Sequence, residues 1–172
     1  MAGVAALALG LEAGEPGIMT RPPRPATEPI INREMTLGIV VQTIAEAGVT
    51  LGAFVLGLRL YPASLIAAQT IAFVTLVSAE LFRAYTARSE RYPLLRLGLF
   101  TNRYMVWATL SSFVLLLGVI YIPALDPIFS TYELPLRDWL FILPLTLVPS
   151  VSAELLKWWY SAWARRPHRA AA

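Results

Sequence analysis

The sequence predicts an all-α membrane protein in which four transmembrane helices form a bundle. The composition points to this class, because 57% of the 172 residues are apolar and only 15% are charged, whereas a soluble domain carries about 25% charged residues. The apolar residues also fall into four stretches, each close to the ~20 residues that cross ~30 Å of hydrocarbon as a helix. Helices are favoured over a barrel, because a helix pairs its own backbone groups in lipid and no alternating strand pattern is present.

Residues 1–34 precede the first apolar stretch and form a proline-rich segment. Proline lacks a backbone N–H and breaks a helix, so we expect no regular helix over residues 12–34. A signal peptide is excluded, because no basic residue precedes the apolar start and the acidic residues Glu12 and Glu15 follow it. We expect this segment to lie in the cytoplasm. Its prolines are Pro16, Pro22, Pro23, Pro25 and Pro29.

The transmembrane domain is expected over residues 35–160, and a basic tail follows over residues 161–172. Connections that contain prolines separate most of the apolar stretches, which fits helices that end where proline cannot continue them. The four helices are expected at about 36–60, 65–82, 104–125 and 139–160.

The fourth stretch carries both aromatic end markers and internal prolines. Trp139 opens it, and Trp158 and Trp159 lie near its end, which is typical of side chains at the two membrane interfaces. Pro144 and Pro149 lie inside the stretch. Because each of these prolines removes a hydrogen-bond donor, we expect the fourth helix to bend.

The basic residues predict how the helices are oriented. Of the 14 Lys and Arg residues, only Arg59 and Arg137 fall on one side of the expected bundle. Because positive charge accumulates on the cytoplasmic side, we expect both termini and the middle connection to be cytoplasmic. Arginines spread over the helix ends suit a lipid surface and not nucleic acid. We therefore expect an integral, multi-pass protein of a prokaryotic plasma membrane, with the lipid membrane as a partner.

Polar side chains on the first stretch share one face. Gln42, Glu46 and Thr50 are spaced i, i+4 and i+8, which places them on one side of a helix. Glu46 would lie near the middle of the bilayer, where an ionised carboxylate costs at least ~2.5 kcal/mol. Glu46 could bind an ion or a proton, or it could form a structural hydrogen bond to a neighbouring helix. We favour the structural interpretation.

The second stretch carries a further pair of polar residues. Gln69 and Glu80 are eleven residues apart, close to three helical turns, and so share a face. Glu80 could form an i, i+3 ion pair with Arg83. Alternatively, its carboxylate could bind a hard cation, which prefers oxygen ligands. Near the end of the fourth stretch, Glu154 and Lys157 are expected to form an i, i+3 ion pair.

No pattern of catalytic residues is present in the sequence. It contains no GxxxxGK[ST], HExxH or GxSxG motif and no cysteine. The single histidine, His168, lies in the basic tail, where a solvated role is favoured over metal binding. We therefore expect that this chain is not an enzyme by itself.

Several short motifs together resemble one known family. They are ALALG at residues 6–10, IMTRPPR at 18–24, EPII at 28–31, QTIAF at 69–73, ELFRAY at 80–85, GLFTNR at 98–103, DWL at 138–140 and ELLK at 154–157. In this order they resemble the carboxyl-terminal part of P-type cation-transporting ATPases of the calcium-pump type. The four stretches are then similar to the family's seventh to tenth membrane helices.

The resemblance implies a role in cation transport. Glu80 matches the position at which the family's eighth helix contributes an acidic cation ligand, so a cation such as calcium is implied, with no cofactor in this chain itself. Ala2 stands where the family has a cation-binding Asp, and Ala5 stands where it has Pro. The DKTGT motif with the phosphorylated Asp and the nucleotide-binding domain are absent from these residues.

Three functions follow from these features. We expect the chain to support cation transport only together with the catalytic part of a pump, as a truncated gene product or one piece of a split pump. The alternative is a small accessory membrane protein that binds another transporter and regulates it. An independent channel is the least favoured, because only Gln42, Glu46, Gln69 and Glu80 could line a path.

Overall fold

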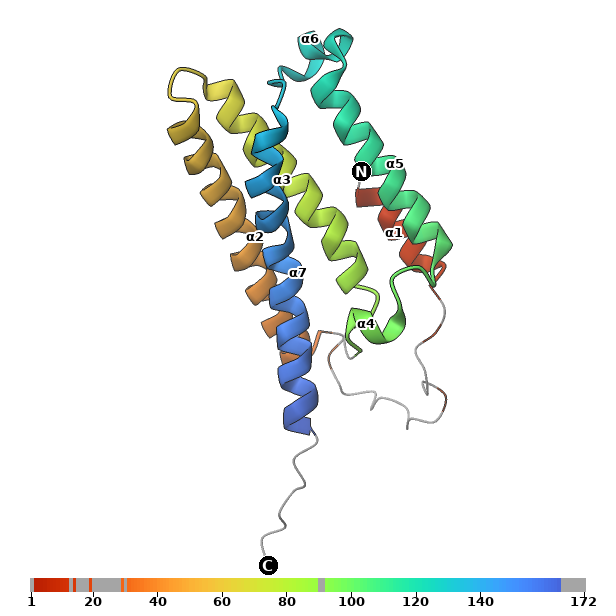
Figure 1. Ribbon diagram of the computed structural model, residues 1–172. Coiled ribbons are helices and arrows are strands. Elements are labelled where there is room, and N and C mark those ends of the chain that lie inside the picture. Colours follow the sequence, from red (N-terminus) through yellow and green to blue (C-terminus); the bar gives the residue numbers. More distant parts are fainter. Residues whose placement is uncertain are drawn as a thin grey trace, which may run out of the picture.

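Helices make up every regular element in the part of the chain that the structure, a computed structural model, describes (Figure 1). Four of them are long and apolar enough to cross a membrane, which confirms the predicted all-α membrane class with four spans. These are α2 (Arg33–Leu60), α3 (Leu65–Thr86), α5 (Arg103–Tyr121) and α7 (Leu136–Ala164). The described residues are 2–12, 14, 19, 29, 31–89 and 92–164. Most of the proline-rich segment and the tail from residue 165, which contains His168, lie outside them.

Side-chain caps explain where three of the long helices begin. Asn32, Ser64 and Asn102 each accept a hydrogen bond from the backbone N–H three residues further on, at 2.8, 3.2 and 3.0 Å. Each bond satisfies one of the backbone donors that the first turn of a helix leaves unpaired. The caps therefore fix the first residues of α2, α3 and α5.

The ends of three helices differ from the prediction, and one of them is α7, which runs past residue 160 to Ala164. The third span was expected to reach residue 125, but α5 ends at Tyr121. Ile122 leaves the helical conformation, with φ −94° and ψ 108°, because it precedes Pro123. The short helices η2 (Pro123–Leu125) and α6 (Asp126–Phe129) follow. Conversely, α3 runs past residue 82 to Thr86, whose side chain is buried.

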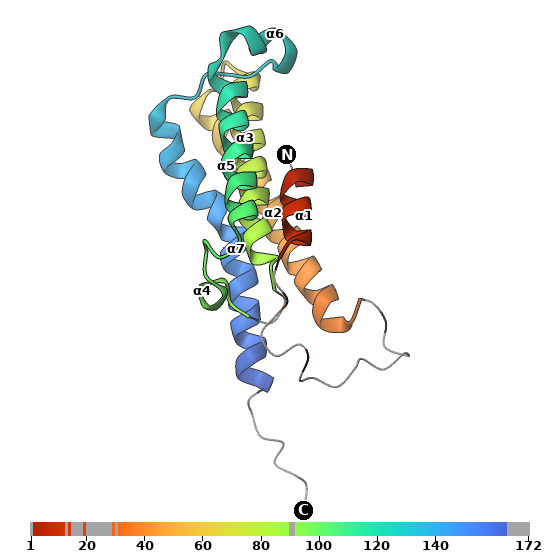
Figure 2. The ribbon, with the colours of Figure 1, turned by 90° about the vertical axis from the view of Figure 1, so that its right-hand side faces the viewer.

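Helix α7 contains Pro144 and Pro149, as expected from the sequence. In Figure 2 the part of α7 nearest α6 is inclined to the rest of the helix. Proline removes a backbone donor and its ring displaces the preceding turn, which accounts for a change of direction at these residues.

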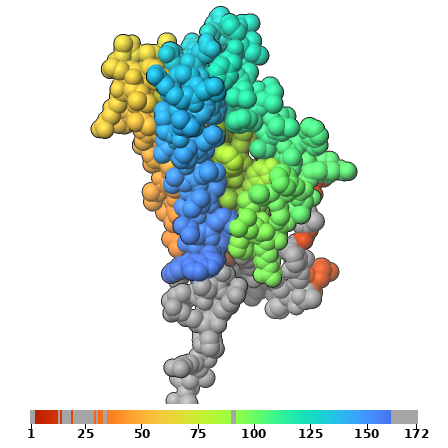
Figure 3. Space-filling view, viewed as in Figure 1, coloured from red at the N-terminus to blue at the C-terminus, as the bar shows by residue number. Residues whose placement is uncertain are grey.

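Helix α3 is the central helix of the bundle. Half of its apolar span (50%) is buried, compared with 11% for α2, 33% for α5 and 22% for α7. Helices α2 and α7 pack against α3 and against each other, while α5 packs against α3 on another side. Figure 3 accordingly shows α3 between α7 and α5. The exposed apolar side chains of the outer helices then face the lipid, as expected for membrane spans.

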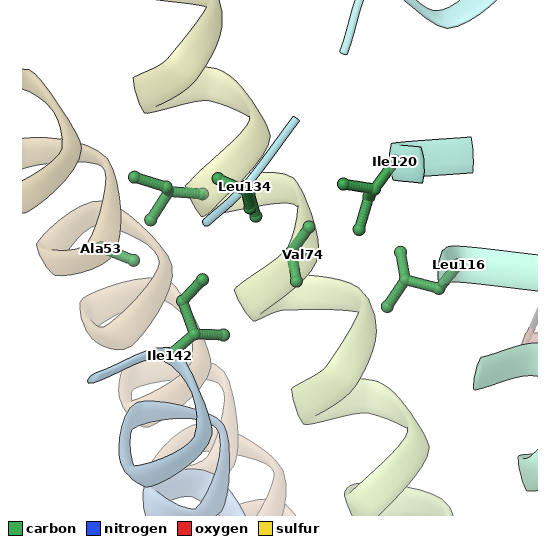
Figure 4. Packing of buried hydrophobic residues seen from close by; sticks show 7 residues of the cluster. Ala53, Val74, Leu116, Ile120, Leu134 and Ile142 are labelled. Atoms are coloured by element: carbon green, nitrogen blue, oxygen red, sulfur yellow. The ribbon is translucent and has the colours of Figure 1, made fainter. Parts of the chain in front are cut away.

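The buried core joins all four spans. Val74 of α3 lies between Leu116 and Ile120 of α5 on one side and Ile142 of α7 on the other (Figure 4). The other buried residues of this cluster are Ala53, Ile71 and Leu134.

Gly57 allows α2 and α3 to approach closely near their connection. A Cβ atom at residue 57 would lie 2.7 Å from the Cα of Ala68, which is backbone and cannot move aside. We predict that Gly57→Ala lowers the free energy of unfolding by about 1–3 kcal/mol, because overpacking forces the helices apart. Thermal unfolding in detergent, followed by circular dichroism, measures this loss.

Gly48→Ala is the matched control, since a Cβ at residue 48 would meet no heavy atom within 4 Å. That change should leave stability unchanged or raise it, because alanine favours a helix over glycine. Equal losses for the two variants would contradict the close approach at Gly57.

A helix that the sequence analysis did not anticipate lies at the start of the described chain. Helix α1 (Ala2–Gly10) packs its alanines, Ala5 and Ala8, against Met105 and Ala108 of α5. Ala84 and Tyr85 of α3 complete this contact. Residues 2–10 contain no proline and several alanines, the best helix formers, which explains why this part of the segment is helical. The last short helix, α4 (Leu94–Leu97), lies between α3 and α5.

Candidate functional site

A charged pair links the outer span α2 to the central span α3. The Nε atom of Arg83 on α3 lies 3.7 Å from Oε2 of Glu46 on α2. The sequence analysis weighed an ion pair between Glu80 and Arg83 within α3. The structure instead pairs Arg83 with Glu46, and among the described residues Glu80 has no ion pair. The guanidinium of Arg83, one turn from the end of α3, thus neutralises the carboxylate of Glu46 in the middle of α2.

A groove on the surface of α2 and α3 lies beside Glu46. It has a volume of about 440 Å³. Oε1 of Glu46 and Oγ1 of Thr50 are buried and have no hydrogen-bond partner among the described residues. Unpaired polar atoms of this kind are costly in an apolar surrounding. The groove is lined by Thr43, Glu46, Ala47, Thr50, Leu51 and Leu76.

The polar residues singled out in the sequence do not all meet. Glu80 is half-buried and close enough to Glu46 for the two carboxylates to repel each other. Thr50 lies one turn from Glu46 in the groove. Gln69 is exposed and lies about 16 Å from Glu80 along α3 at ~1.5 Å per residue. Gln42 is half-buried, one turn from Glu46. The structure thus brings Glu46, Glu80, Arg83 and Thr50 to one region and leaves Gln69 apart.

The described residues do not assemble a metal centre. Within them, no three His, Cys, Asp or Glu side chains converge on one point. A calcium ion takes 6–8 oxygen ligands. Glu80 could therefore supply one or two oxygens to such a site, and the remaining ligands would have to come from other residues.

A second polar cluster, which the sequence analysis missed, lies beyond the end of α3. Arg88 donates from Nε and Nη2 to the two carboxylate oxygens of Glu12, at 2.9 and 2.6 Å. It also donates to the carbonyl oxygen of Gly98 at 2.7 Å and to Oγ1 of Thr101 at 2.6 Å. Asn102 donates to Oε2 of Glu12 at 2.6 Å. No spacing rule could have revealed the ion pair, since its partners are 76 residues apart.

The hydrogen bond from Arg88 lowers the pKa of Glu12 below its ordinary value of 4.5, against the opposing effect of burial, and Asn102 lowers it further. A carboxylate with a lowered pKa stabilises the fold above that ordinary value, and this contribution is lost as the pH falls through the folded-state pKa. We predict that acid below pH 4.5 weakens the attachment of α1 in the natural chain. Hydrogen exchange of the α1 amides, corrected for intrinsic rates, measures this change.

In a Glu12→Gln variant the attachment of α1 should be weaker at neutral pH and should vary little over the same acid range. The same steep acid dependence in both proteins would show that another group titrates.

Helix α7 also binds the end of α3. Lys157 donates to the carbonyl oxygen of Thr86 at 2.6 Å and to Oε1 of Glu154 at 2.9 Å. Oε2 of Glu154 accepts a hydrogen bond from the backbone N–H of Leu94 at 2.8 Å. The predicted Glu154–Lys157 ion pair is therefore confirmed, and it also fixes the end of α3 to the start of α4.

A third polar cluster closes the opposite end of the bundle. The hydroxyl of Tyr61, just after α2, donates to Oδ2 of Asp138 in the first turn of α7 at 2.7 Å. Asp138 is only 2% exposed, and its Oδ1 lies 3.6 Å from Nε of Arg137. Burial raises the pKa of Tyr61, so its hydroxyl stays protonated and able to donate. This cluster ties α2 to α7.

Four apolar spans with charged side chains inside them define an integral, multi-span membrane protein. The family model described as "Cation transporting ATPase, C-terminus" matches residues 1–159, and the chain belongs to this family.

Named relatives agree with this membership. The chain is 36% identical over 148 residues to the calcium-transporting ATPase of Bacillus subtilis. The aligned segment covers 86% of this chain and 16% of the relative. It is 33% identical over 160 residues to calcium-transporting ATPase type 2C member 1 of Homo sapiens, and this alignment covers 91% of the chain and 17% of the relative. The chain thus spans less than a fifth of the length of these relatives.

Proposed function

We propose that this chain forms the C-terminal part of the transport domain of a calcium-transporting pump, and that it supports cation transport together with a catalytic part. The match of residues 1–159 to the C-terminal family model carries this proposal. The relatives, named as calcium-transporting ATPases, suggest calcium as the cation. These 172 residues contain no DKTGT motif, so ATP hydrolysis would depend on other residues.

Glu80 is the proposed cation ligand of this part. It lies within a span and is half-buried. Arg83, the nearest cation along α3, is engaged by Glu46, so the oxygens of Glu80 stay available to a metal ion. Glu46 and Thr50 are proposed to serve the packing of spans, in line with the structural interpretation favoured from the sequence. Gln42 and Gln69 would extend these polar faces.

We also propose that both termini and the connection from α3 to α5 face the cytoplasm of a prokaryotic cell. Support comes from the arginine distribution, which leaves only Arg59 and Arg137 on the other side. The ends of α3 and α7 and the start of α5 share one end of the bundle (Figure 1). Single cysteines at Leu95 and Ile128, which are 87% and 73% exposed, report the orientation. Labelling of position 128 but not 95 from outside intact cells is expected, and the reverse would contradict this orientation.

A chimera tests the transport function. Residues 1–159 of this chain replace the matched segment of the Bacillus subtilis relative, and ATP-dependent calcium uptake is measured in membrane vesicles. We expect uptake well above that of the relative with the segment deleted, and no phosphorylation of the 172-residue chain alone by ATP. A chimera that inserts at the normal level but transports no more than the deletion would contradict the proposal.

The groove on α2 and α3 favours an alternative function, that of an accessory protein which binds another transporter. A foreign membrane helix could lie in this groove against Thr43, Ala47 and Leu76, which are among its lining residues. If this function is correct, the chimera is inactive, and the free chain binds an intact transporter. Mutation of Thr50 would then weaken that binding.

A further inference from the structure

Helix α1 makes a small apolar contact with the rest of the protein. Ala5 and Ala8 are its buried apolar residues, at 4% and 5% exposure. Of its larger side chains, Val4 and Leu7 are 51% and 76% exposed, while Leu9 is partly buried against the contact. Alanine permits close approach but buries little surface, and apolar stabilisation scales with the buried area. Packing alone therefore holds α1 weakly in position.

The polar contacts at the end of α1 are much more specific. The side chain of Arg88 is 1% exposed, and its guanidinium meets both oxygens of Glu12. Asn102, the cap of α5, donates to Ala8 of α1 at 3.1 Å and to Glu12. One arginine thus joins the chain after α1 to the end of α3 and, through Gly98 and Thr101, to the start of α5.

The geometry suits arginine alone. The guanidinium offers five N–H donors in a rigid fork, which can meet a carboxylate with two bonds and still serve other acceptors. A lysine ammonium carries a single nitrogen and could not reach the four acceptor oxygens that Arg88 serves. Among the described residues, Arg88 is the charged group that acts on Glu12, and Asn102 is the polar neighbour.

We propose that Arg88 and Glu12 form a latch that decides whether α1 is docked on α3 and α5 or released from them. When the latch is closed, α1 has a single register along α3. Ala5 and Ala8 then lie beside Ala84 and Tyr85. With the latch open, the apolar contacts of Ala5, Ala8 and Leu9 are what hold α1 among the described residues.

The latch sets the depth of α1 in the bundle. Glu80 lies one turn before Ala84, and Ala2 lies one turn before Ala5. Both helices run towards the α4 end (Figure 2), and Ala84, one turn after Glu80 along α3, packs against α1. This consequence, unlike the latch itself, rests on the proposed function: Arg88 would be a positioning residue that holds α1 against α3 one turn from the cation ligand.

Cysteine labelling measures the docking of α1 directly, because the chain contains no cysteine of its own. A thiol at Ala8 is buried when α1 is docked, whereas a thiol at Leu7 is exposed in either state. The rate of N-ethylmaleimide labelling at residue 8, divided by the rate at residue 7, therefore reports release of α1. The measurement is made on the full chain in detergent at neutral pH.

The ratio is compared among latch variants and a matched control. We expect Arg88→Gln and Glu12→Gln each to raise it at least about tenfold, the effect of losing a hydrogen bond to a charged group. Arg88→Lys should fall between Arg88→Gln and the natural chain. Arg96→Gln is the control, because Arg96 is exposed and its guanidinium lies over the ring of Tyr92; it should leave the ratio unchanged.

The double variant distinguishes a latch from a general loss of structure. If Arg88 and Glu12 act as one unit, the ratio in the double variant equals that of either single variant, whereas independent effects multiply. An unchanged ratio in Glu12→Gln, multiplied effects, or an equal response to Arg96→Gln would each overturn the proposal. Should Arg88→Gln fail to fold, the shape-preserving Glu12→Gln alone decides. These outcomes do not depend on calcium transport, so the latch can fail while the proposed function stands.

Discussion

Replacing Arg83 by leucine is expected to destabilise the bundle strongly. Arg83 is the cation that pairs with Glu46 in the middle of α2. Its loss would leave a carboxylate unpaired within the span, where a charge costs about 2.5–3.5 kcal/mol. Since Arg83 is 43% exposed on its side chain, we expect a smaller loss of roughly 2 kcal/mol in the free energy of unfolding. Thermal unfolding in detergent, followed by circular dichroism, measures it.

The double variant Arg83→Leu, Glu46→Gln should recover most of this stability, because it removes the unpaired charge and keeps the shape of the side chain. Arg96→Leu serves as the control for loss of an exposed arginine. If Glu46→Gln adds a further loss to that of Arg83→Leu, then Glu46 has another partner and the ion pair does not account for its position.

Replacing Asp138 by alanine should have the other large effect. Asp138 is 2% exposed and accepts the hydroxyl of Tyr61 at 2.7 Å. Its loss leaves the half-buried Tyr61 hydroxyl without its acceptor and removes the negative charge near the start of α7, where the helix dipole favours it. We expect a loss of about 2–3 kcal/mol, typical of a hydrogen bond to a charged group. Chemical unfolding in mixed micelles would measure it.

Tyr61→Phe provides the check on this pair. Added to Asp138→Ala it should cost little more, since the hydroxyl has already lost its acceptor. Glu133→Ala, at an exposed position before α7 and five residues before Asp138, controls for loss of an acidic residue. Additive losses from Tyr61 and Asp138 would show that the two residues act separately.

The spans were predictable because their cause is local. Length, apolar composition and caps such as Asn32 and Ser64 act over a few residues, and they place the starts of the helices in the sequence. The end of α5 was misplaced because the apolar run continues to residue 125, whereas Pro123 stops the helix earlier. The end of α5 is therefore set by the proline, which stops the helix, and not by the length of the apolar run.

The partners of the charged residues were less predictable because they depend on packing between distant segments. Glu154 and Lys157 are neighbours on one helix, and their pair was expected. Arg83 had an acidic neighbour on its own helix, Glu80, yet it pairs with Glu46 on α2. The Arg88 and Glu12 pair joins residues 76 apart. Helical spacing carries no information about such contacts.

Helix α1 was missed for a related reason. The prolines from Pro16 onward dominated the analysis of the first segment, although residues 2–10 contain none. A helix there is stabilised by its contacts with Met105 and Ala108, which lie far along the chain. Its alanine content was the only local sign of a helix.

The calcium dependence of transport by the chimera tests the central claim most directly. The calcium concentration for half-maximal uptake is measured for Glu80→Ala and for the control Glu133→Ala, which removes a carboxylate exposed at the other end of the bundle. If α3 supplies a cation ligand, Glu80→Ala should raise this concentration at least about tenfold, the effect of losing one charged interaction, while Glu133→Ala leaves it unchanged. An unchanged calcium dependence in a well-folded Glu80→Ala chimera would contradict the claim.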